Sequence, residues 1–544
     1  MRAWAGAGLL GAILVRGPAV PAFAGGVGAT DVACVPSEAD QAFQDGLRAQ
    51  QRLDTEDALA SYTRCLDLAP TCVRCRYELG WTYRSRGEWE NVVGAWRAVL
   101  EQQPDHPDAA RWLREAAEHR DLAAVDPTGG GLHPVIGTMS TPDGVGIHLK
   151  LIARFQNFDA DPESAADRYD KDIFSPKSVT FSFDGRRAFV NALEGRRTVV
   201  YDAQALDKLG TIEHQFGPDD SDLFFGQSET FGYSYLDKPE HGDVNQFAGK
   251  PVEASLSHGG KYLWVPYYRR DFDLSGTSPS AIAIIEVASQ KIVRVMPTGP
   301  IPKYVTASNN GRWVAVTHWG DHTIGLIDVA HASGSDFRYT RHLVVGAPLP
   351  LNDLVSVDRD AECGSCLRGT VFTPDGRTLL VARMGDDGIA GFDVPSGRYL
   401  GSVVDLPKGP RHLALSSRAV WLFLSSNEAG VVSRTHLARM VHALRRAKGK
   451  DIQWKSWKSV TVGEGARTIA LTGDDRYLFA AVNKASEIVV VDALRMQVVA
   501  RVAADGFPVG LALSPNGRRL WATAQGRGGR GGNAVDVYSV RIGR

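Results

Sequence analysis

The chain has 544 residues, of which 61 are Lys or Arg and 62 are Asp or Glu, so its formal net charge is −1. A chain of this length exceeds one ordinary hydrophobic core, and two or more folded units are expected. The near-neutral charge excludes a general electrostatic attraction to nucleic acid or to a membrane surface.

The first 24 residues have the pattern of an export signal. Arg2 supplies a positive start, 5–15 is a short apolar stretch, and Ala22-Phe23-Ala24 matches a small-x-small cleavage site. The apolar stretch is too short to span a bilayer, and no later segment is as long as the roughly 20 apolar residues that a span needs. We therefore expect an exported soluble protein, periplasmic or extracellular. An uncleaved membrane anchor is the alternative.

Residues 25–120 are predicted to form a small all-α domain. A spacing of 34 residues relates Gly46 to Gly80 and Tyr62 to Trp96. Large and small packing residues at this period are typical of tetratricopeptide repeats, which the region resembles. The resemblance implies docking of a protein or peptide partner, and a packing or spacer role is the alternative.

The six cysteines, an even number, fit an oxidising compartment. Four of them flank or lie within the helical repeats, namely Cys34, Cys65, Cys72 and Cys75. We expect two disulfides that brace the helical domain. A zinc site formed by the same four residues is the alternative.

A Gly- and Pro-rich linker is predicted over 121–146. The alternation of apolar and polar residues in 147–156 then predicts a half-buried strand. Seven similar strand starts follow, most with a hairpin turn, at 176–182, 251–257, 302–308, 367–373, 410–416, 466–472 and 508–514. Such a repeat indicates the four-stranded blades of a β-propeller.

The predicted fold is therefore mainly β, with a seven-bladed propeller over 147–544. A turn residue followed seventeen positions later by an Asp recurs at Gly185, Gly311, Gly376 and Asp475. The last blade lacks an outer strand before the sequence ends. We expect the N-terminal strand 147–156 to supply it and to close the ring.

Three blade sequences carry a family resemblance, namely AVTHWGDHTIGLID, FVNALEGRRTVVYD and FAAVNKASEIVVVD. With the P-x-x-apolar starts that precede them, they resemble the YVTN-type β-propellers, which include exported YncE-like proteins. The resemblance covers 147–544 and implies the fold. The group and its structural cousins include surface proteins, binding proteins, lyases, lactonases and enzyme subunits, so the resemblance implies no catalytic residues.

Aligned strand starts place a basic residue at the same position in five of the seven blades. The loop leading into each innermost strand opens on one face, so these side chains are expected at one mouth of the propeller. The set is Lys177, Lys303, Arg368, Arg411 and Arg467, and adjacent positions add Glu253, Tyr304 and His412. A ring of cations concentrates positive potential, and Arg suits carboxylates and phosphates. The sequence predicts an anion site, and pairing with loop acids is the alternative.

Cys363 and Cys366 lie in the loop that leads into blade four and are expected at the same mouth. A disulfide is favoured by the compartment and the spacing. A reactive thiol pair is one alternative. A copper or zinc site completed by His318, His322 or His412 is the other.

The long aromatic-rich insertion 214–243 is expected to pack as a lid over the mouth. Two functions are open. In the first, an exported scaffold binds an anionic small molecule, peptide or glycan at the mouth and docks a partner with its helical repeats. In the second, a metal- or thiol-dependent oxidoreductase, or a lyase or hydrolase, uses the same mouth. The binding function is favoured because the sequence shows no recognisable pair of catalytic nucleophile and base. No nucleic-acid partner is expected.

Overall fold

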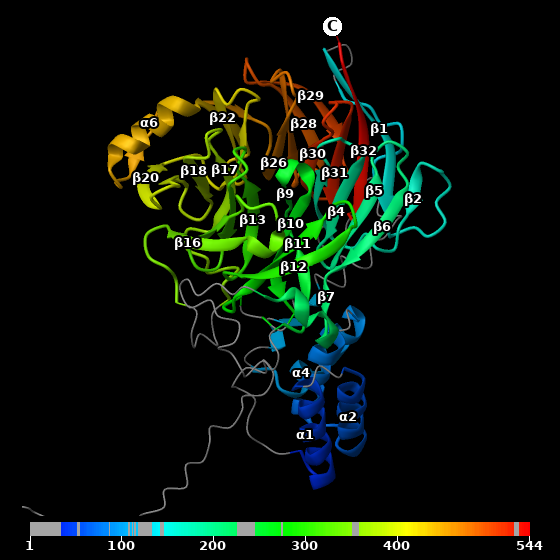
Figure 1. Cartoon of the computed structure of the whole chain (residues 1–544). Helices are drawn as coiled ribbons and strands as arrows, with labels where there is room; N and C mark the ends of the chain where they lie inside the picture. Colours follow the sequence, from blue (N-terminus) through cyan, green and yellow to red (C-terminus); the bar gives the residue numbers. More distant parts are fainter. Residues whose placement is uncertain are drawn as a thin grey trace, which may run out of the picture.

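The computed structural model describes residues 34–51, 55–85, 88–106, 109–110, 112–113, 116–117, 133–141, 146–225, 245–271, 273, 276–350, 358–526 and 532–543. The expected signal peptide, most of the expected linker and the central part of the expected lid lie outside these residues. Figure 1 shows a helical module on one side of a β-propeller.

The helical module contains α1 (Ser37–Gln51), α2 (Thr55–Leu68), α3 (Val73–Ser85) and α4 (Trp89–Gln102). The described parts of 109–117 are also helical and bury Ala109, Trp112 and Ala116. A helical region before the propeller is thus confirmed.

A close contact between a glycine and an aromatic ring explains the 34-residue period of the module. A Cβ added at Gly46 would overlap the ring of Tyr62, and one added at Gly80 would overlap the indole of Trp96. Both rings are fully buried. Only glycine allows the two helices of each pair to approach so closely, so each repeat needs a glycine opposite an aromatic residue.

We expect Gly80→Ala to lower the free energy of unfolding of the helical module by about 1–2 kcal/mol, because overpacking against Trp96 outweighs the gain in helix propensity. Gly94→Ala is the matched control, since Gly94 lies within α4 and a Cβ there meets nothing within 4 Å. That change should stabilise the module by up to about 1 kcal/mol. Denaturant unfolding followed by helical circular dichroism measures both. Equal stabilisation by both substitutions would contradict the packing argument.

Each of the first four blades is a sheet of antiparallel hairpins. Blade one contains β3 (Pro176–Phe181), β4 (Arg187–Ala192), β5 (Arg197–Asp202) and β6 (Lys208–Glu213). Blade two contains β9 (Ser255–Ser257), β10 (Tyr262–Arg270), β11 (Ser280–Glu286) and β12 (Lys291–Thr298), with β7 (Gln215–Phe216) and β8 (Phe247–Pro251) added to β10. Blade three contains β13 (Pro302–Ala307), β14 (Trp313–His318), β15 (Thr323–Asp328) and β16 (Arg338–Val344). Blade four contains β17 (Leu367–Phe372), β18 (Thr378–Arg383), β19 (Gly388–Asp393) and β20 (Arg398–Val404), extended by β24 (Ile452–Gln453).

The remaining three blades repeat this pattern. Blade five contains β21 (Pro410–Leu415), β22 (Trp421–Ser426), β23 (Val431–His436) and β25 (Lys458–Thr461). Blade six contains β26 (Ala466–Leu471), β27 (Tyr477–Val482), β28 (Glu487–Asp492) and β29 (Gln497–Ala503). Blade seven contains β30 (Pro508–Leu513), β31 (Arg519–Ala524), β32 (Ala534–Ile542) and β1 (Ile147–Gln156), extended by β2 (Asp167–Tyr169).

The ring is closed by strands from opposite ends of the propeller. Strand β1 pairs antiparallel with β32, from Ile147 opposite Ile542 to Gln156 opposite Ala534. The seven-bladed fold with closure by an N-terminal strand is therefore confirmed. Closure removes the open sheet edges that would otherwise attract other chains.

A repeated turn explains why a Gly or Asp recurs at the same position in several blades. In six blades the hydroxyl after the innermost strand accepts the N–H of the residue five positions later, at Ser182, Ser308, Thr373, Ser416, Thr472 and Ser514. A residue with positive φ follows, which is Gly185 in blade one and Ala419 in blade five. Glycine enters this conformation without strain, so most blades carry it there.

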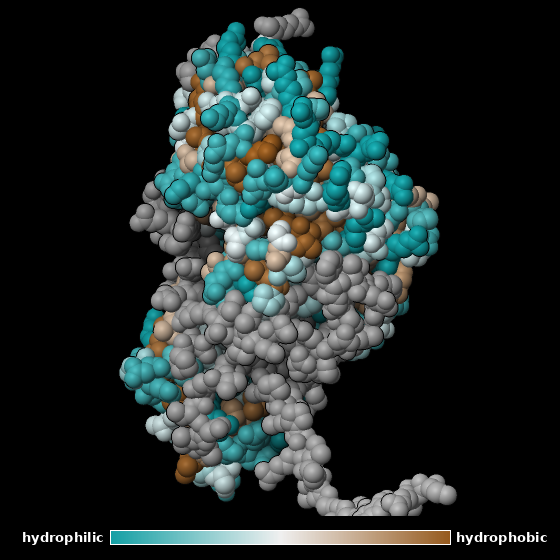
Figure 2. Space-filling view, turned by 90° about the vertical axis from the view of Figure 1, so that its left-hand side faces the viewer, coloured by the Kyte–Doolittle hydropathy of each residue, from teal (hydrophilic) through white to brown (hydrophobic). Residues whose placement is uncertain are grey.

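Blade five carries an inserted helix, α6 (Leu437–Ala447), at the left of Figure 1. Its buried residues Leu437, Met440, Val441 and Leu444 join a hydrophobic cluster with residues of blades four and five. Figure 2 shows this side of the molecule, where hydrophilic side chains dominate the propeller surface. Within the described residues, no helix has the length and apolar character of a membrane span.

Candidate functional site

The five predicted basic residues all lie near the beginnings of innermost strands: Lys177 in β3, Lys303 in β13, Arg368 in β17, Arg411 in β21 and Arg467 in β26. These strands surround the propeller axis and pass close to one another. A Cβ added at Gly369 of β17 would lie 2.5 Å from the carbonyl oxygen of Arg411. Topologically equivalent side chains from different blades therefore meet at one mouth.

The structure brings the five cations within electrostatic reach of one another. Burial holds the pKa of Lys177 well below its usual value, and the charges of the other four cations add to this effect. The same two causes, burial and then the Arg368 and Arg467 charges, depress the pKa of Arg411. The guanidinium-bearing residues Arg368, Arg411 and Arg467 are only 6–9% exposed. The mouth is thus a region of concentrated positive charge in a protein whose net charge is nearly zero.

Glu253 supplies a carboxylate to this cluster. Burial raises its pKa, while Arg368, Lys177, Arg467 and Arg411 act in the opposite direction. No ion pair within 4 Å joins Glu253 to any of these cations in the part of the chain that the structure describes. One carboxylate therefore faces four basic groups without neutralising them.

Lys303 is paired separately. Its Nζ lies 2.7 Å from Asp360 Oδ1, and it sits over the rings of Tyr268 and Trp319 at 4.1 Å and 4.9 Å from their centroids. Trp319 Nε1 donates to the carbonyl oxygen of Asp360 at 2.9 Å. Although burial alone would raise the pKa of Asp360, Lys303 and Arg269 hold it well below its usual value. Asp360 is therefore an ionised partner of Lys303.

Two of the arginines have donor atoms without a strong acceptor in the described structure. The Nη1 atom of Arg368 is buried and has no hydrogen-bond partner among the described residues. Arg411 directs Nη1 at the sulfur of Met384, a weak acceptor, at 3.4 Å. Buried arginines normally have carboxylate or carbonyl partners, so these two guanidiniums are suited to an anion that enters the mouth.

Tyr304 and His412 form a neutral hydrogen-bonded pair in the same ring. The Tyr304 hydroxyl lies 3.0 Å from His412 Nε2, and the backbone N–H of Ile469 points at His412 Nδ1 at 3.5 Å. Burial, with Arg411 and Arg368, lowers the pKa of His412 to about 3, so the imidazole is neutral at pH 7. If Nδ1 accepts from Ile469, Nε2–H donates to Tyr304, and the Tyr304 proton is free to face a ligand.

Four other side chains of the mouth are less completely buried than the arginines. Lys177, Glu253, Tyr304 and His412 retain part of their accessible surface. Burial is nevertheless the largest influence on the pKa of each. These side chains therefore lie in a largely desolvated environment but keep some contact with solvent.

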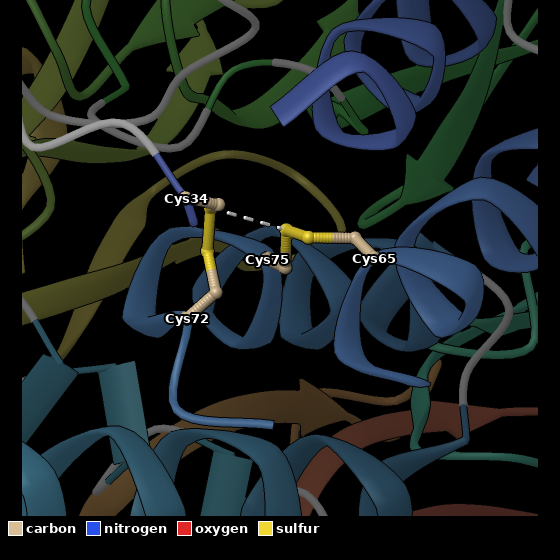
Figure 3. Close-up of side chains that lie close together, drawn as sticks. All are labelled: Cys34, Cys65, Cys72 and Cys75. Atoms are coloured by element: carbon tan, nitrogen blue, oxygen red, sulfur yellow. Dashed lines mark hydrogen bonds between the residues drawn. A yellow bond between two sulfur atoms is a disulfide. The ribbon is translucent and has the colours of Figure 1, made fainter. Parts of the chain in front are cut away.

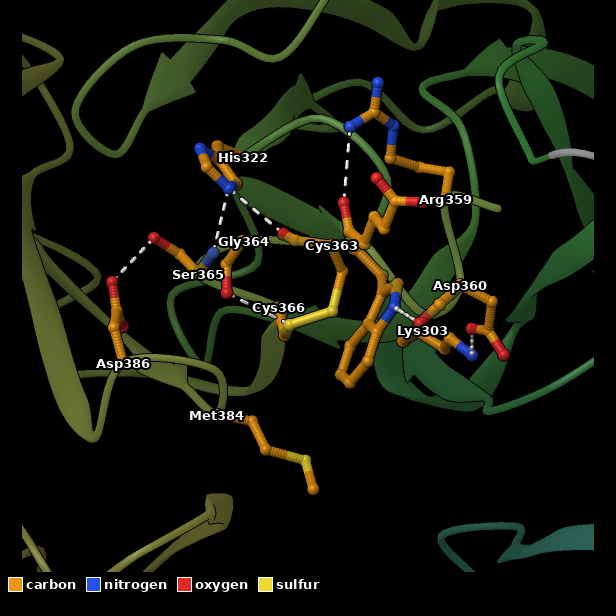
Figure 4. Close-up of a disulfide and its surroundings, with 12 residues drawn as sticks. Lys303, His322, Arg359, Asp360, Cys363, Gly364, Ser365, Cys366, Met384 and Asp386 are labelled. Carbon is orange, nitrogen blue, oxygen red and sulfur yellow. Dashed lines mark hydrogen bonds and ion pairs between the residues drawn. A yellow bond between two sulfur atoms is a disulfide. The ribbon is translucent and has the colours of Figure 1, made fainter. Parts of the chain in front are cut away.

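Cys363 and Cys366 form a disulfide, which was the favoured interpretation of their spacing (Figure 4). The loop that it closes lies between Asp360 and Arg368, so the disulfide helps to hold both groups at the mouth. His322 binds this loop, since its Nε2 lies 2.8 Å from Ser365 N and 3.0 Å from the carbonyl oxygen of Cys363.

His318 occupies a different environment from the one that the sequence suggested. It is fully buried, with Nδ1 2.7 Å from Thr323 Oγ1 and Nε2 2.6 Å from Thr298 Oγ1. Both ring nitrogens thus face threonine hydroxyls, and the sulfurs of Cys363 and Cys366 bond to each other. In the described part of the chain, the group of ligands suited to a metal is the set of four cysteines in the helical module.

The helical module lies on the face of the propeller that carries the mouth. Phe174, which stands just before β3, packs against the aromatic cluster of α3 and α4. The Lys250–Glu194 ion pair, at 2.8 Å, lies within electrostatic reach of Arg84 of α3. Figure 1 shows α4 beneath the strands of blade two. The module therefore contacts blades one and two on this face.

Sequence reasoning missed two contributors from blade two, Tyr268 and Arg269. They stand at the end of the unusually long strand β10, where the sequence reads YYRRD. Arg269 Nη2 lies 3.5 Å from Asp358 Oδ1. The available signal was an aromatic pair followed by a basic pair at the end of a predicted second strand.

A comparison with protein families supports the propeller fold. A family model described as "Lactonase, 7-bladed beta-propeller" matches residues 280–538. No curated protein matches the chain. Solved structures similar to it include the hydrazine synthase of Kuenenia stuttgartiensis, at 14% identity over 70% of this chain and 100% of that chain, with a TM-score of 0.47. The Cps50 (Swd1) β-propeller domain of Myceliophteria thermophila has 11% identity over 67% and 96% of the two chains and a TM-score of 0.45. These values carry no argument about function.

Proposed function

We propose that this chain is an exported binding protein, of the YVTN type, whose propeller mouth holds a small multivalent anion. Arg368, Arg411 and Arg467 contact its carboxylate or phosphate groups, and Tyr304 donates a further hydrogen bond. The tetratricopeptide-like repeats dock a protein or peptide partner beside the mouth. The periplasm or the extracellular space is the expected location, which agrees with the disulfide-bonded cysteines.

The observation that carries this proposal is the unbalanced buried charge. Five basic groups converge on two carboxylates, Glu253 and Asp360, and one of these is already paired with Lys303. Buried charges without partners are costly, and a protein retains them where a ligand supplies the missing partner. Guanidiniums from neighbouring blades can each form a bidentate hydrogen bond with two oxygens of a di- or tricarboxylate or of a phosphate.

Calorimetric titration of the purified chain with citrate, inorganic phosphate and sulfate tests the proposal. We expect one saturable site per chain whose affinity falls as ionic strength rises, because the interaction is electrostatic. A neutral polyol of similar size serves as the control. Failure of all three anions to bind at low ionic strength would refute an anion site of this kind.

Anion affinity is expected to fall as the pH rises through about 7. Burial, assisted by Arg368, lowers the pKa of Lys303 to about 7 despite the opposing effect of Asp360. The protonated ammonium attracts an anion and the neutral amine does not, so the affinity at pH 6 should exceed that at pH 8 by up to about tenfold. Sulfate is the appropriate probe because its own charge is constant over this range. Lys303→Met should weaken the pH dependence, although Lys177 and Glu253 still titrate in the same site. A flat profile in the unmodified protein would contradict the assignment.

A second candidate function is hydrolysis of an anionic lactone at the same mouth. Burial raises the pKa of Glu253, which places a carboxyl that can exchange a proton beside guanidiniums that can polarise a carbonyl. The name of the matching family model points to the same substrate class. If this activity exists, Glu253→Gln should abolish turnover of sugar-acid lactones in a pH-stat assay while retaining sulfate binding. Loss of both would show a structural role for Glu253.

A further inference from the structure

Four cysteines from three separate segments meet inside the helical module (Figure 3). Cys34 precedes α1, Cys65 lies in the last turn of α2, and Cys72 and Cys75 are at the beginning of α3. All four are buried in the hydrophobic cluster that joins these helices. They form the disulfides Cys34–Cys72 and Cys65–Cys75.

The two disulfides touch each other. The Sγ atoms of Cys34 and Cys75, which belong to different disulfides, are 3.7 Å apart (Figure 3). All four Sγ atoms lie within 4.8 Å of one another. Disulfides that only connect helices have no need to be adjacent. In a tetrahedral zinc site with Zn–S bonds of about 2.3 Å, neighbouring sulfurs are about 3.8 Å apart. The fold therefore gathers four sulfurs close enough for one metal ion to reach all of them once the two S–S bonds are reduced.

The local electrostatics favour thiolates. The carbonyl oxygen of Cys72 accepts the N–H of Arg76 at 3.3 Å, so Cys72 occupies the N-cap of α3 and Cys75 lies in its first turn. That turn contains no acidic residue. Arg74, between the two cysteines, pairs with Asp40 at 3.3 Å, and the same Asp40 oxygen accepts the backbone N–H of Cys34. The free N–H groups at a helix N-terminus stabilise negative sulfur at Cys72 and Cys75. They would also offset the charge of a zinc ion bound by four thiolates.

We propose that the four cysteines, when reduced, bind one Zn²⁺ ion, so that the same cluster closes the module either by two disulfides or by one metal ion. Reduction of both disulfides consumes four electrons and four protons, which two equivalents of a dithiol supply as they become disulfides. Coordination of Zn²⁺ by the four resulting thiols then releases four protons and forms four Zn–S bonds. This site is separate from the propeller mouth and does not depend on the function proposed for it.

A structural reason makes the metal-bound state useful to the module. The core that joins α1, α2 and α3 is small, and the four cysteines make up a third of its buried members. A helical unit of this size depends on a covalent or metal connection for stability. In a reducing environment, or before oxidation during export, zinc would maintain the packing that the disulfides later provide.

Cobalt titration of the full-length chain tests the proposal. The variant carrying Cys363→Ser and Cys366→Ser leaves only the four cysteines of the module. It is reduced without oxygen by a phosphine, the reductant is removed, and Co²⁺ is added. We expect one Co²⁺ per chain, with the strong visible bands of tetrahedral cobalt thiolate and the ultraviolet sulfur-to-metal charge transfer, and displacement by one equivalent of Zn²⁺.

Cys72→Ser and Cys75→Ser, each in the same background, should abolish these bands and the stoichiometric binding. Far-ultraviolet circular dichroism accompanies every titration. If reduction weakens the helical signal, one equivalent of Zn²⁺ should restore it. Two results would overturn the proposal: no cobalt thiolate spectrum together with no recovery of helicity, or a spectrum that persists when Cys75 is replaced by Ser.

Discussion

The Arg411→Met variant is expected to bind citrate about 100-fold more weakly than the unmodified protein, and yet to be more stable when no ligand is present. Truncating one partner of a buried, hydrogen-bonded charge pair costs about 2–5 kcal/mol of binding free energy, and each tenfold change in Kd corresponds to about 1.4 kcal/mol. Arg411 is also buried and repelled by Arg368 and Arg467, which depress its pKa. Replacing it with an apolar side chain of similar length removes that repulsion.

Calorimetry gives the affinity, and thermal unfolding with and without citrate gives the stability. At saturating citrate the unmodified protein should be more stable than Arg411→Met. Citrate stabilises the folded protein in proportion to its affinity, and the variant binds it weakly. Arg377→Met is the matched control, since Arg377 is an exposed arginine in the hairpin turn of blade four. It removes the same charge and should change neither quantity measurably. A variant at Arg411 that unfolds at a lower temperature and retains its affinity would show that Arg411 is structural.

Replacing Arg154 should produce the largest loss of stability in the propeller. Arg154 of β1 is 3% exposed and binds three acidic groups that hold the closing strands together. Its Nε lies 3.2 Å from Asp536 Oδ1 and 3.3 Å from Asp505 Oδ2, and its Nη1 lies 2.9 Å from Asp167 Oδ2. Arg154→Met leaves these carboxylates buried without their partner, which costs about 3–5 kcal/mol of unfolding free energy.

Arg168→Met is the control for this prediction. Arg168 lies in β2, the edge strand of the same sheet. Its side chain is 36% exposed and pairs with the exposed Asp207 at 3.0 Å. Loss of such a surface pair should cost at most about 1 kcal/mol. Denaturant unfolding of both variants beside the unmodified protein measures the difference. Equal effects of the two substitutions would contradict a special role for Arg154 in ring closure.

The loss of unfolding free energy caused by Arg154→Met should depend on pH. Burial already raises the pKa of Asp536 to about 6 in the folded protein, above its value in the unfolded chain. A carboxyl group whose pKa is higher in the folded than in the unfolded state binds its proton more tightly when folded. Protonation of Asp536 therefore stabilises the fold at low pH, and this stabilisation is lost as the pH rises through about 4 to 6. Without Arg154 the folded pKa rises further, so the loss extends to higher pH. The variant should therefore be much closer to the unmodified protein at pH 5 than at pH 8.

Much of the architecture could be predicted from residues close together in the chain. The hydroxyl that ends each innermost strand and the positive-φ residue after it lie within six positions, as in Ser182–Arg187 with Gly185. Repetition of this unit predicts the blades. Once blades are aligned, equivalent positions predict that Lys177, Arg368 and Arg411 face one axis. The resemblance to YVTN-type propellers agrees with this and adds nothing about the ligand.

Other features could not be predicted because they depend on contacts between distant segments. Helix α6 was missed, since its apolar face forms a core only against blades four and five. The role of His318 was also missed. His318 and His322 are four residues apart, yet one is held between threonines in a blade core and the other binds the disulfide loop. Sequence spacing does not distinguish these environments, because the turn between them reverses the chain.

The sequence by itself determined the repeat, the number of blades, the strand that closes the ring and the positions of its cations, because each follows from local periodicity and from the equivalence of blades. Only the tertiary structure decided how cysteines pair, that Lys303 binds Asp360, and that Arg154 meets Asp536, 382 residues later in the chain. These contacts form only when the ring closes and the helices pack. Their energies depend on burial and on the distances between charges, which no periodicity in the sequence records.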